Sequence, residues 1–135
     1  MLAVMVLGAD GVQVGSRFVA SNEASSHELF KQKVVEAGEG DTILTLKELA
    51  PVRLIKNKFF QDIQNLYAKS PSVEELKQLL GRARAKKGMF EGDMEEGELE
   101  IGQVSAIIHD IKPAAEIVAD MVVEFEEAKK YCTQL

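Results

Sequence analysis

The sequence predicts an α/β chain that is predominantly helical, with one or two short strands. Two patterns lead to this prediction. Apolar residues recur at helical spacing through much of the chain, most clearly over residues 114–125. The short stretch Val12-Gln13-Val14 instead runs into Gly15, as a buried parallel strand does where it ends in a turn. The 135 residues are enough for one compact domain with its own core.

Composition and charge argue against one class of function, nucleic-acid binding. Apolar residues make up 46% of the chain and charged residues 28%, which is an ordinary balance for a globular protein. The net charge of −6 argues against a nucleic-acid-binding surface, which needs clustered Lys and Arg. The basic run at 82–87 is followed at once by the acidic run at 91–100, so we expect a solvated face there.

The cysteine count and the N-terminus indicate a soluble cytoplasmic protein. The single cysteine, Cys132, cannot form an internal disulfide, and no histidine lies near it in the sequence to activate a nucleophile. The apolar start covers about nine residues, whereas a membrane span needs roughly 20. It also lacks the basic start of a secretory signal. We expect neither a membrane nor a nucleic acid as partner.

The N-terminal part predicts a helix, a strand and a second helix. Residues 2–7 read as the end of a buried helix, because they are apolar on every side and Gly8 suits the stop. A helix that starts without a capping residue favours Met1 as an internal methionine of a longer parent chain. The strand at 12–14 follows, and then a helix over 26–37.

The middle of the chain predicts a strand over 42–46, which alternates and is rich in β-branched residues. After Pro51, apolar residues at helical spacing predict a helix over 52–68. Ser72, with Glu75 three residues later, predicts a capping box at the start of the next helix.

The C-terminal half predicts two more helical segments. The capped helix is expected to run to about residue 85, and a polar loop over 88–97 follows it. A short apolar segment at 101–109 comes next. Pro113 then opens the last helix, because proline suits the first helical position.

The segment with chemical potential is the strand and turn at 12–16. Gly15 and Ser16, at the carboxyl end of a strand, would present two backbone N–H groups beside a hydroxyl, and glycine allows close approach of a ligand. The last strands of many (β/α)8 barrels bind phosphate in this way. Taken alone, the pattern is more often a simple turn.

Residues 7–18, LGADGVQVGSRF, resemble the final barrel strand of the nitronate monooxygenase (2-nitropropane dioxygenase) and enoyl-ACP reductase II family. In that family a small-residue turn precedes V-Q-x-G-[ST]-R-F. The resemblance extends over about residues 1–128, although Ile101 stands where the family often has alanine. Further matches follow in the family's order, at 23–27, 52–57, 92–93 and 102–106.

The resemblance implies the C-terminal portion of an FMN-binding (β/α)8 TIM barrel with a family-specific helical region. The barrel would be incomplete, because a whole one needs about 250 residues. Residues 1–38 would hold the last barrel strand with its flanking helices. Residues 39–100 would form a helical insertion, and 101–135 the C-terminal helices.

The resemblance also implies a site for FMN at Gln13, Val14, Gly15 and Ser16. Gly15 and Ser16 would offer backbone N–H groups, and the Ser16 hydroxyl would help to hold the phosphate. Gln13 lies on the same strand face as Gly15 and would point toward the flavin. Serine replaces the more frequent threonine and keeps the donor. For Arg17, a phosphate contact and a salt bridge on the outer wall are both open.

No catalytic or metal-binding residue is expected in the chain. In the resembling family the substrate-side histidine and the glycine-rich half of the phosphate site lie upstream of this motif. His27 is expected to cap a helix or face solvent, and His109 to meet a helix C-terminus. The acidic segment 91–100 lacks the spacing of a calcium loop.

Three functions remain open. The resemblance favours oxidation of alkyl nitronates with dioxygen, because this label is the broader one. The alternative within the family is enoyl-ACP reductase II, which reduces enoyl thioesters with NAD(P)H through the flavin. A non-catalytic helical interaction module is the alternative of another class, with the apolar segment 2–7 as its surface. The chain alone is expected to be inactive, and its oligomeric state is open.

Overall fold

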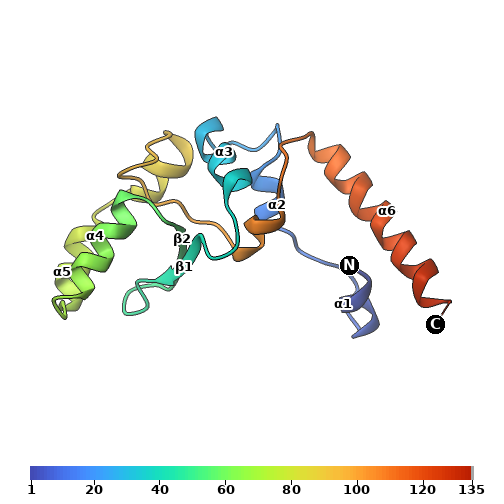
Figure 1. Cartoon of the computed structure of the whole chain (residues 1–135), viewed down its shortest axis with the longest axis horizontal. Helices are drawn as coiled ribbons and strands as arrows, with labels where there is room; N and C mark the ends of the chain where they lie inside the picture. The colour runs from blue at the N-terminus through green and yellow to red at the C-terminus, as the bar shows by residue number, and fades with distance from the viewer. Residues whose placement is uncertain (135) are drawn as a thin grey trace.

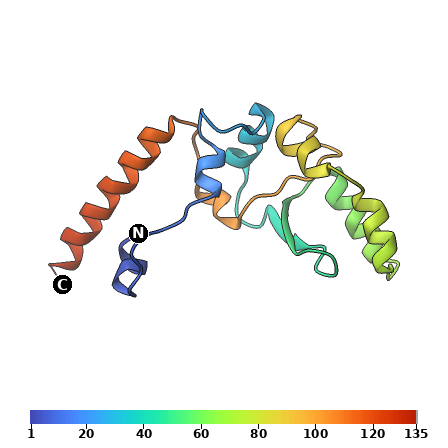
Figure 2. The same cartoon turned by 180° about the vertical axis from the view of Figure 1, so that it is seen from behind.

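The computed structural model describes residues 1–134 and has a packed centre with elements extending to both sides (Figures 1 and 2). Helices α4 and α5 lie at one end and α6 runs away from the centre at the other, with the short α1 beside it. Most residues in regular structure are helical, as the sequence predicts. The elements in chain order are α1 (Leu2–Val6), α2 (Ser16–Val19), α3 (Glu28–Glu36), β1 (Thr42–Thr45), β2 (Val52–Ile55), α4 (Lys58–Tyr67), α5 (Val73–Leu80), η1 (Lys86–Phe90), η2 (Gln103–Ile107) and α6 (Ala114–Cys132).

Strands β1 and β2 form an antiparallel hairpin in which Thr42 pairs with Ile55 and Thr45 with Val52. The prediction of β1 is confirmed, but the prediction of a helix from residue 52 is wrong for β2. β-Branched residues near its ends suit a strand, and backbone pairing with β1 decides the conformation. The helix starts only after Asn57, whose side chain accepts a hydrogen bond from the Phe60 N–H at 2.9 Å.

The capping box at the start of α5 is confirmed. Ser72 Oγ accepts from the Glu75 N–H at 3.3 Å, and the Glu75 carboxylate accepts from the Ser72 N–H at 2.8 Å. The helix ends at Leu80 rather than near residue 85. Gly81 has a φ of 65°, which stops the helix, and Arg84 Nε donates to the Leu80 carbonyl at 2.8 Å.

The prediction of a polar loop over 88–97 is wrong for its first residues, because the π-helix η1 extends to Phe90. Two glycines make this turn compact. A Cβ added to Gly97 would lie 2.2 Å from the Gly88 Cα, so the two backbone segments cross where no side chain fits. The short apolar segment that follows contains the 3-10 turn η2.

Two apolar clusters form the core, and β2 contributes to both. Adjacent residues of a strand point to opposite faces, so Leu54 enters one cluster and Ile55 the other. The first cluster lies around α3 and contains Ala20, Phe30, Val34, Ile55, Leu99, Ile101 and Ile108. The second joins the hairpin to α4 and α5 and contains Leu46, Leu54, Phe59, Phe60, Ile63 and Leu76.

The N-terminal segment differs from its prediction in burial and in strand formation. Helix α1 forms and Gly8 has a φ of 100°, but no residue of α1 is buried within the described chain. Residues 12–14 form no strand, because no strand among residues 1–134 pairs with them. Leu7 is 86% exposed, which contradicts the prediction of a buried helix end.

Helix α6 begins at Ala114, so Pro113 is its N-cap and not its first helical residue as predicted, and the helix contacts α1. Of its residues, all of which are described, Ile117 alone is buried, while Val118, Val122 and Val123 are about half exposed. Within the described residues no helix is long and apolar enough to cross a membrane.

Candidate functional site

The turn at Gly15 and Ser16 has a set of free backbone donors. The Gly15 carbonyl accepts from the Phe18 N–H at 2.9 Å and so starts the short helix α2. Across residues 1–134, no group accepts a hydrogen bond from the N–H of Gly15, Ser16 or Arg17. A Cβ added to Gly15 would meet no described heavy atom within 4 Å, so the space beside these donors is open.

The Ser16 hydroxyl is held by a residue far away in the sequence. The Gly102 N–H donates to Ser16 Oγ at 3.2 Å, across 86 positions. The contact brings together two of the segments that carry the family resemblance. It was not predicted, and the presence of Gly102 in one of the matched segments was the only signal for it.

Arg17 forms an ion pair with Asp110, and its Nη1 also donates to the Asp110 carbonyl at 3.0 Å. The salt-bridge alternative is therefore the one that the structure has. Asp110 also lies 3.2 Å from Lys112 Nζ, which in turn contacts Asp120 at 2.6 Å. Burial opposes ionisation of Asp110, but the hydrogen bond from Lys112 and the charge of Arg17 outweigh it, so the pKa of Asp110 is lowered.

All four predicted cofactor-binding residues, Gln13, Val14, Gly15 and Ser16, line one pocket of about 590 Å³. Apart from Arg17, the rest of its lining comes from residues 104–124 and is mixed: apolar side chains such as Ile107, Ile117 and Met121 stand beside the carboxylates of Asp110, Asp120 and Glu124. The pocket is therefore formed by parts of the chain that lie about 90 residues apart and meet at the turn.

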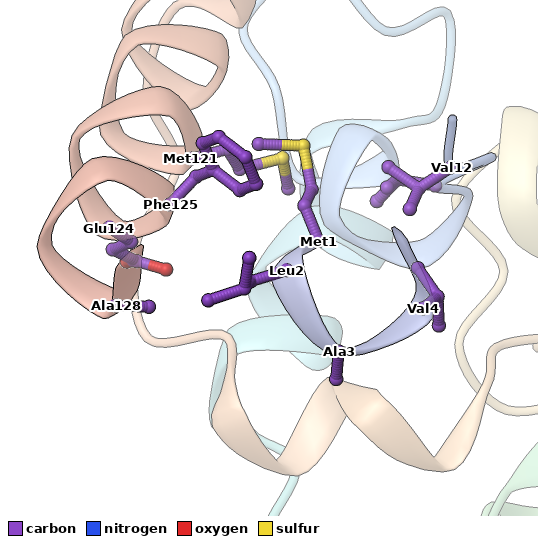
Figure 3. A pocket seen from close by; sticks show the side chains of 10 residues that line it. Met1, Leu2, Ala3, Val4, Val12, Met121, Glu124, Phe125 and Ala128 are labelled. Atoms are coloured by element: carbon purple, nitrogen blue, oxygen red, sulfur yellow. The ribbon is translucent and has the colours of Figure 1, made fainter. Parts of the chain in front are cut away.

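A second pocket, of about 490 Å³, lies between α1 and α6 and has a largely apolar lining (Figure 3). Met1 and Met121 approach each other across it, beside the ring of Phe125, and Leu2 reaches toward α6. Glu124 is its one charged lining residue. This second pocket contains no arrangement of polar groups that suggests chemistry.

The other candidate residues have structural positions. His27 caps α3, because its Nδ1 accepts from the Leu29 N–H at 3.2 Å, which confirms the capping prediction. Cys132 is exposed near the end of α6. Among the described residues no group of three or more His, Cys, Asp and Glu side chains is placed to hold a metal ion.

Two carboxyl groups with strongly shifted pKa values lie away from the turn. Burial is the main reason why the pKa of Glu98 is raised to about 7, and the charge of Glu100 acts in the same direction. The pKa of Asp93 is lowered to about 2, first by the hydrogen bond from the Glu96 N–H and then by Lys87. Both belong to the segment after α5, so we assign them to folding rather than to the pocket.

The fold and the turn together define a class of protein: an α/β chain with a turn whose backbone N–H groups are free of partners within residues 1–134. Three free N–H groups, a hydroxyl and open space beside a glycine suit a phosphate group. The nearby cations Arg17 and Lys112 are already paired with Asp110 and Asp120, so backbone and hydroxyl dipoles would contact the anion. The residues of the turn could therefore contact one side of a phosphate group.

The chain belongs to the nitronate monooxygenase family, because the family model named "Nitronate monooxygenase" matches residues 1–124. This match confirms the resemblance found in the sequence. A "probable nitronate monooxygenase" of Staphylococcus aureus (strain MSSA476) is 28% identical over 132 residues, which cover 97% of the chain and 37% of that relative. Another, from Bacillus subtilis (strain 168), is 44% identical over 61 residues, 44% of the chain and 18% of the relative.

Two solved structures share the fold. FabK from Thermotoga maritima is 34% identical with a TM-score of 0.84, and the match covers 98% of this chain and 42% of FabK. Nitroalkane oxidase from Streptomyces ansochromogenes is 28% identical with a TM-score of 0.69, covering 96% of this chain and 37% of the oxidase. The chain thus spans less than half the length of these proteins.

Proposed function

We propose that this chain belongs to an FMN-dependent oxidoreductase of the nitronate monooxygenase type, which oxidises alkyl nitronates with dioxygen. In this proposal the chain supplies the C-terminal portion of an FMN-binding (β/α)8 barrel. The observation that supports it most directly is the set of unpartnered N–H groups at Gly15, Ser16 and Arg17, beside a pocket and in a chain of this family.

The residues of the turn would hold the phosphate of FMN. The N–H groups of Gly15, Ser16 and Arg17 would donate to its oxygens, and the Ser16 O–H would add a fourth donor. Gln13 and Val14 line the same pocket and would lie along the rest of the cofactor. The flavin supplies the electron transfer when it is bound, while the protein binds and orients it.

The local charges limit what this chain contributes. Arg17 and Lys112 are neutralised by Asp110 and Asp120, so the turn offers dipoles without a free cation. The remaining phosphate donors would come from the turn after the preceding barrel strand, as the resemblance implies. We therefore expect weak binding of FMN by residues 1–135 alone and no turnover.

A second candidate is the enoyl-ACP reductase II reaction, with NAD(P)H as the source of hydride. The comparison with FabK favours it, because this chain is 34% identical to FabK with a TM-score of 0.84, against 28% and 0.69 for the nitroalkane oxidase. The curated relatives favour the nitronate reaction by their names. The two reactions share the phosphate turn and differ in the substrate.

The proposal is tested by titrating the ¹⁵N-labelled chain with FMN and with riboflavin, which lacks the phosphate. Amide NMR shifts detect binding even in the millimolar range. We expect FMN to bind at least about tenfold more tightly than riboflavin, since several donors contact the phosphate. The amides of Gly15, Ser16 and Arg17 should show the largest shifts. Equal affinities, or no response to either compound, would contradict a phosphate site at this turn.

A further inference from the structure

We propose that Gly102 and the Arg17–Asp110 ion pair position the Ser16 hydroxyl as a hydrogen-bond donor to the phosphate. Both are positioning groups that act through Ser16 and do not contact the cofactor themselves. The inference rests on the proposed function, because it concerns the same phosphate site. It assigns a role to residues 102–112, which lie far from the turn in the sequence.

The hydrogen bond from Gly102 leaves the Ser16 proton free. A serine hydroxyl has one O–H donor and two acceptor lone pairs, and the Gly102 N–H occupies one lone pair at 3.2 Å. Within residues 1–134 no acceptor for the Ser16 O–H is found. A hydroxyl that accepts a hydrogen bond becomes a better donor, since the two bonds polarise each other. The geometry therefore favours donation to an anion in the open space.

Gly102 is needed for space and not for its backbone conformation. Its φ of −70° and ψ of 154° are open to any residue. A Cβ at this position, however, would lie 2.8 Å from Ser16 Oγ, closer than carbon and oxygen approach without displacement. Gly15 differs in this respect, because a Cβ there would meet no described atom. A methyl group at residue 102 would thus displace the hydroxyl directly.

The Arg17–Asp110 pair fastens the distant segment to the turn. Arg17 directly follows Ser16 and is 18% exposed, with hydrogen bonds to both the carboxylate and the carbonyl of Asp110. Two further contacts continue the connection. The Asn22 N–H donates to the Lys112 carbonyl at 3.2 Å, and Glu23 accepts from the Ala114 N–H at 2.8 Å.

These contacts explain why Arg17 is not assigned to the phosphate. Its guanidinium is committed to Asp110, and the contacts around it set the distance between α2 and η2, which touch each other. The N–H of Gly102, at the start of η2, is placed against Ser16 as a result. Loss of the ion pair should therefore weaken the same donor as loss of the glycine.

The test measures FMN and riboflavin affinities for the whole chain and its variants by NMR titration. For Gly102→Ala we expect the FMN affinity to fall by about tenfold, the size of one hydrogen bond to a charged group. Riboflavin affinity should not change. Ser16→Ala should give the same loss, and the double variant should lose no more than either single variant. Gly38→Ala is the matched control, because its Cβ would make an ordinary contact at 3.5 Å to Asp41.

The ion pair is tested with Asp110→Asn, which keeps the side-chain shape and removes the charge. We expect a loss of FMN affinity of several fold, again without an effect on riboflavin and without additivity to Ser16→Ala. Asp41→Asn is the control carboxylate, far from the pocket in sequence. If Gly102→Ala fails to fold, Asp110→Asn and its control Asp41→Asn still test the inference.

Four outcomes would overturn the inference. Equal losses of FMN and riboflavin affinity would make the residues merely structural. Losses that add to that of Ser16→Ala would mean that they act independently of the hydroxyl. If FMN binds through its phosphate but neither Gly102→Ala nor Asp110→Asn weakens the binding, the inference is refuted and the proposed function stands. If the unmodified chain does not prefer FMN to riboflavin, the proposed function fails and the inference falls with it.

Discussion

Two regions of the molecule contain similar apolar residues but bury them very differently. In the central region, residues 16–112, Phe30, Phe59 and Ile63 are at most 1% exposed. In the terminal region, which is residues 1–14 together with α6, the described helices bury only Ile117. The comparison shows that apolar spacing determines which face of a helix seeks contact, whereas burial depends on which elements pack against it.

The two regions also differ in how their helices are held. In the central region the caps of α4 and α5 and the clusters around the hairpin support each other. Helix α6 is attached through the hydrogen bond from the Ala114 N–H to Glu23, through the ion pair of Asp120 with Lys112, and through contacts with α1 and α2. We therefore expect substitutions to have large effects in the central region and small effects in the terminal region.

The largest effect is expected for Phe59→Ala. Phe59 is fully buried, and Arg84 lies 4.3 Å from the centre of its ring. Truncation of a buried phenylalanine lowers the free energy of unfolding by about 3–5 kcal/mol. Phe125→Ala in α6 is the matched control and should cost less than about 1 kcal/mol, because its ring is only partly buried. Urea unfolding measures both, and equal losses would show that α6 is packed in solution.

The next effect concerns Glu98, whose pKa is raised to about 7. A raised pKa in the folded state means that stability is full below the ordinary value near 4.5 and declines as the pH rises through 7. We expect Glu98→Gln to remove this decline and to raise the Tm at pH 8. Glu95→Gln, at an exposed position, is the control. A Tm difference between Glu98→Gln and the unmodified chain that stays constant from pH 5 to pH 8 would contradict the assignment.

A smaller effect of opposite sign is expected for Asp93, whose pKa is lowered to about 2. Its contribution is present above the ordinary value of 3.8 and is lost as the pH falls through 2. Asp93→Asn should lower the Tm at pH 7, since the Glu96 N–H loses a charged acceptor at 2.7 Å. The difference from the unmodified chain should shrink in acid. Thermal unfolding followed by circular dichroism, at pH 7 and in acid near the pKa of about 2, measures this Tm difference.

The smallest effect is expected for Leu7→Ser, because Leu7 is 86% exposed beside α1. The free energy of unfolding should change by less than about 0.5 kcal/mol. Leu76→Ser, at a position that is 1% exposed in the second cluster, is the comparison and should be severely destabilising. If Leu7→Ser is also severe, the terminal region is covered in solution and the contrast between the regions is wrong.

The candidate site was named from local sequence, whereas the contacts around it depend on distant residues. Gln13 to Ser16 do line one pocket, although their contact with FMN remains a prediction. The contact between Gly102 and Ser16 was missed, because no local pattern reports a hydrogen bond across 86 residues. For Arg17 the sequence allows either a phosphate contact or a salt bridge. The structure has the salt bridge, because Asp110 lies next to the guanidinium.

Local chemistry accounts for what could be predicted from the amino-acid order. The capping box of Ser72 and Glu75, the stop at Gly8 and the start of α6 after Pro113 depend on residues within a few positions of each other. Their hydrogen bonds and backbone preferences are the same in almost any fold.

Tertiary structure decided the features that need a distant partner. The segment Val52–Ile55 fits a helical pattern and becomes a strand because β1 pairs with it. Residues 12–14 fit a strand and form none, because no described strand pairs with them. Strand formation and burial are both properties of a pair of segments. A single stretch of sequence therefore predicts only which partner it needs, and the fold determines whether that partner is there.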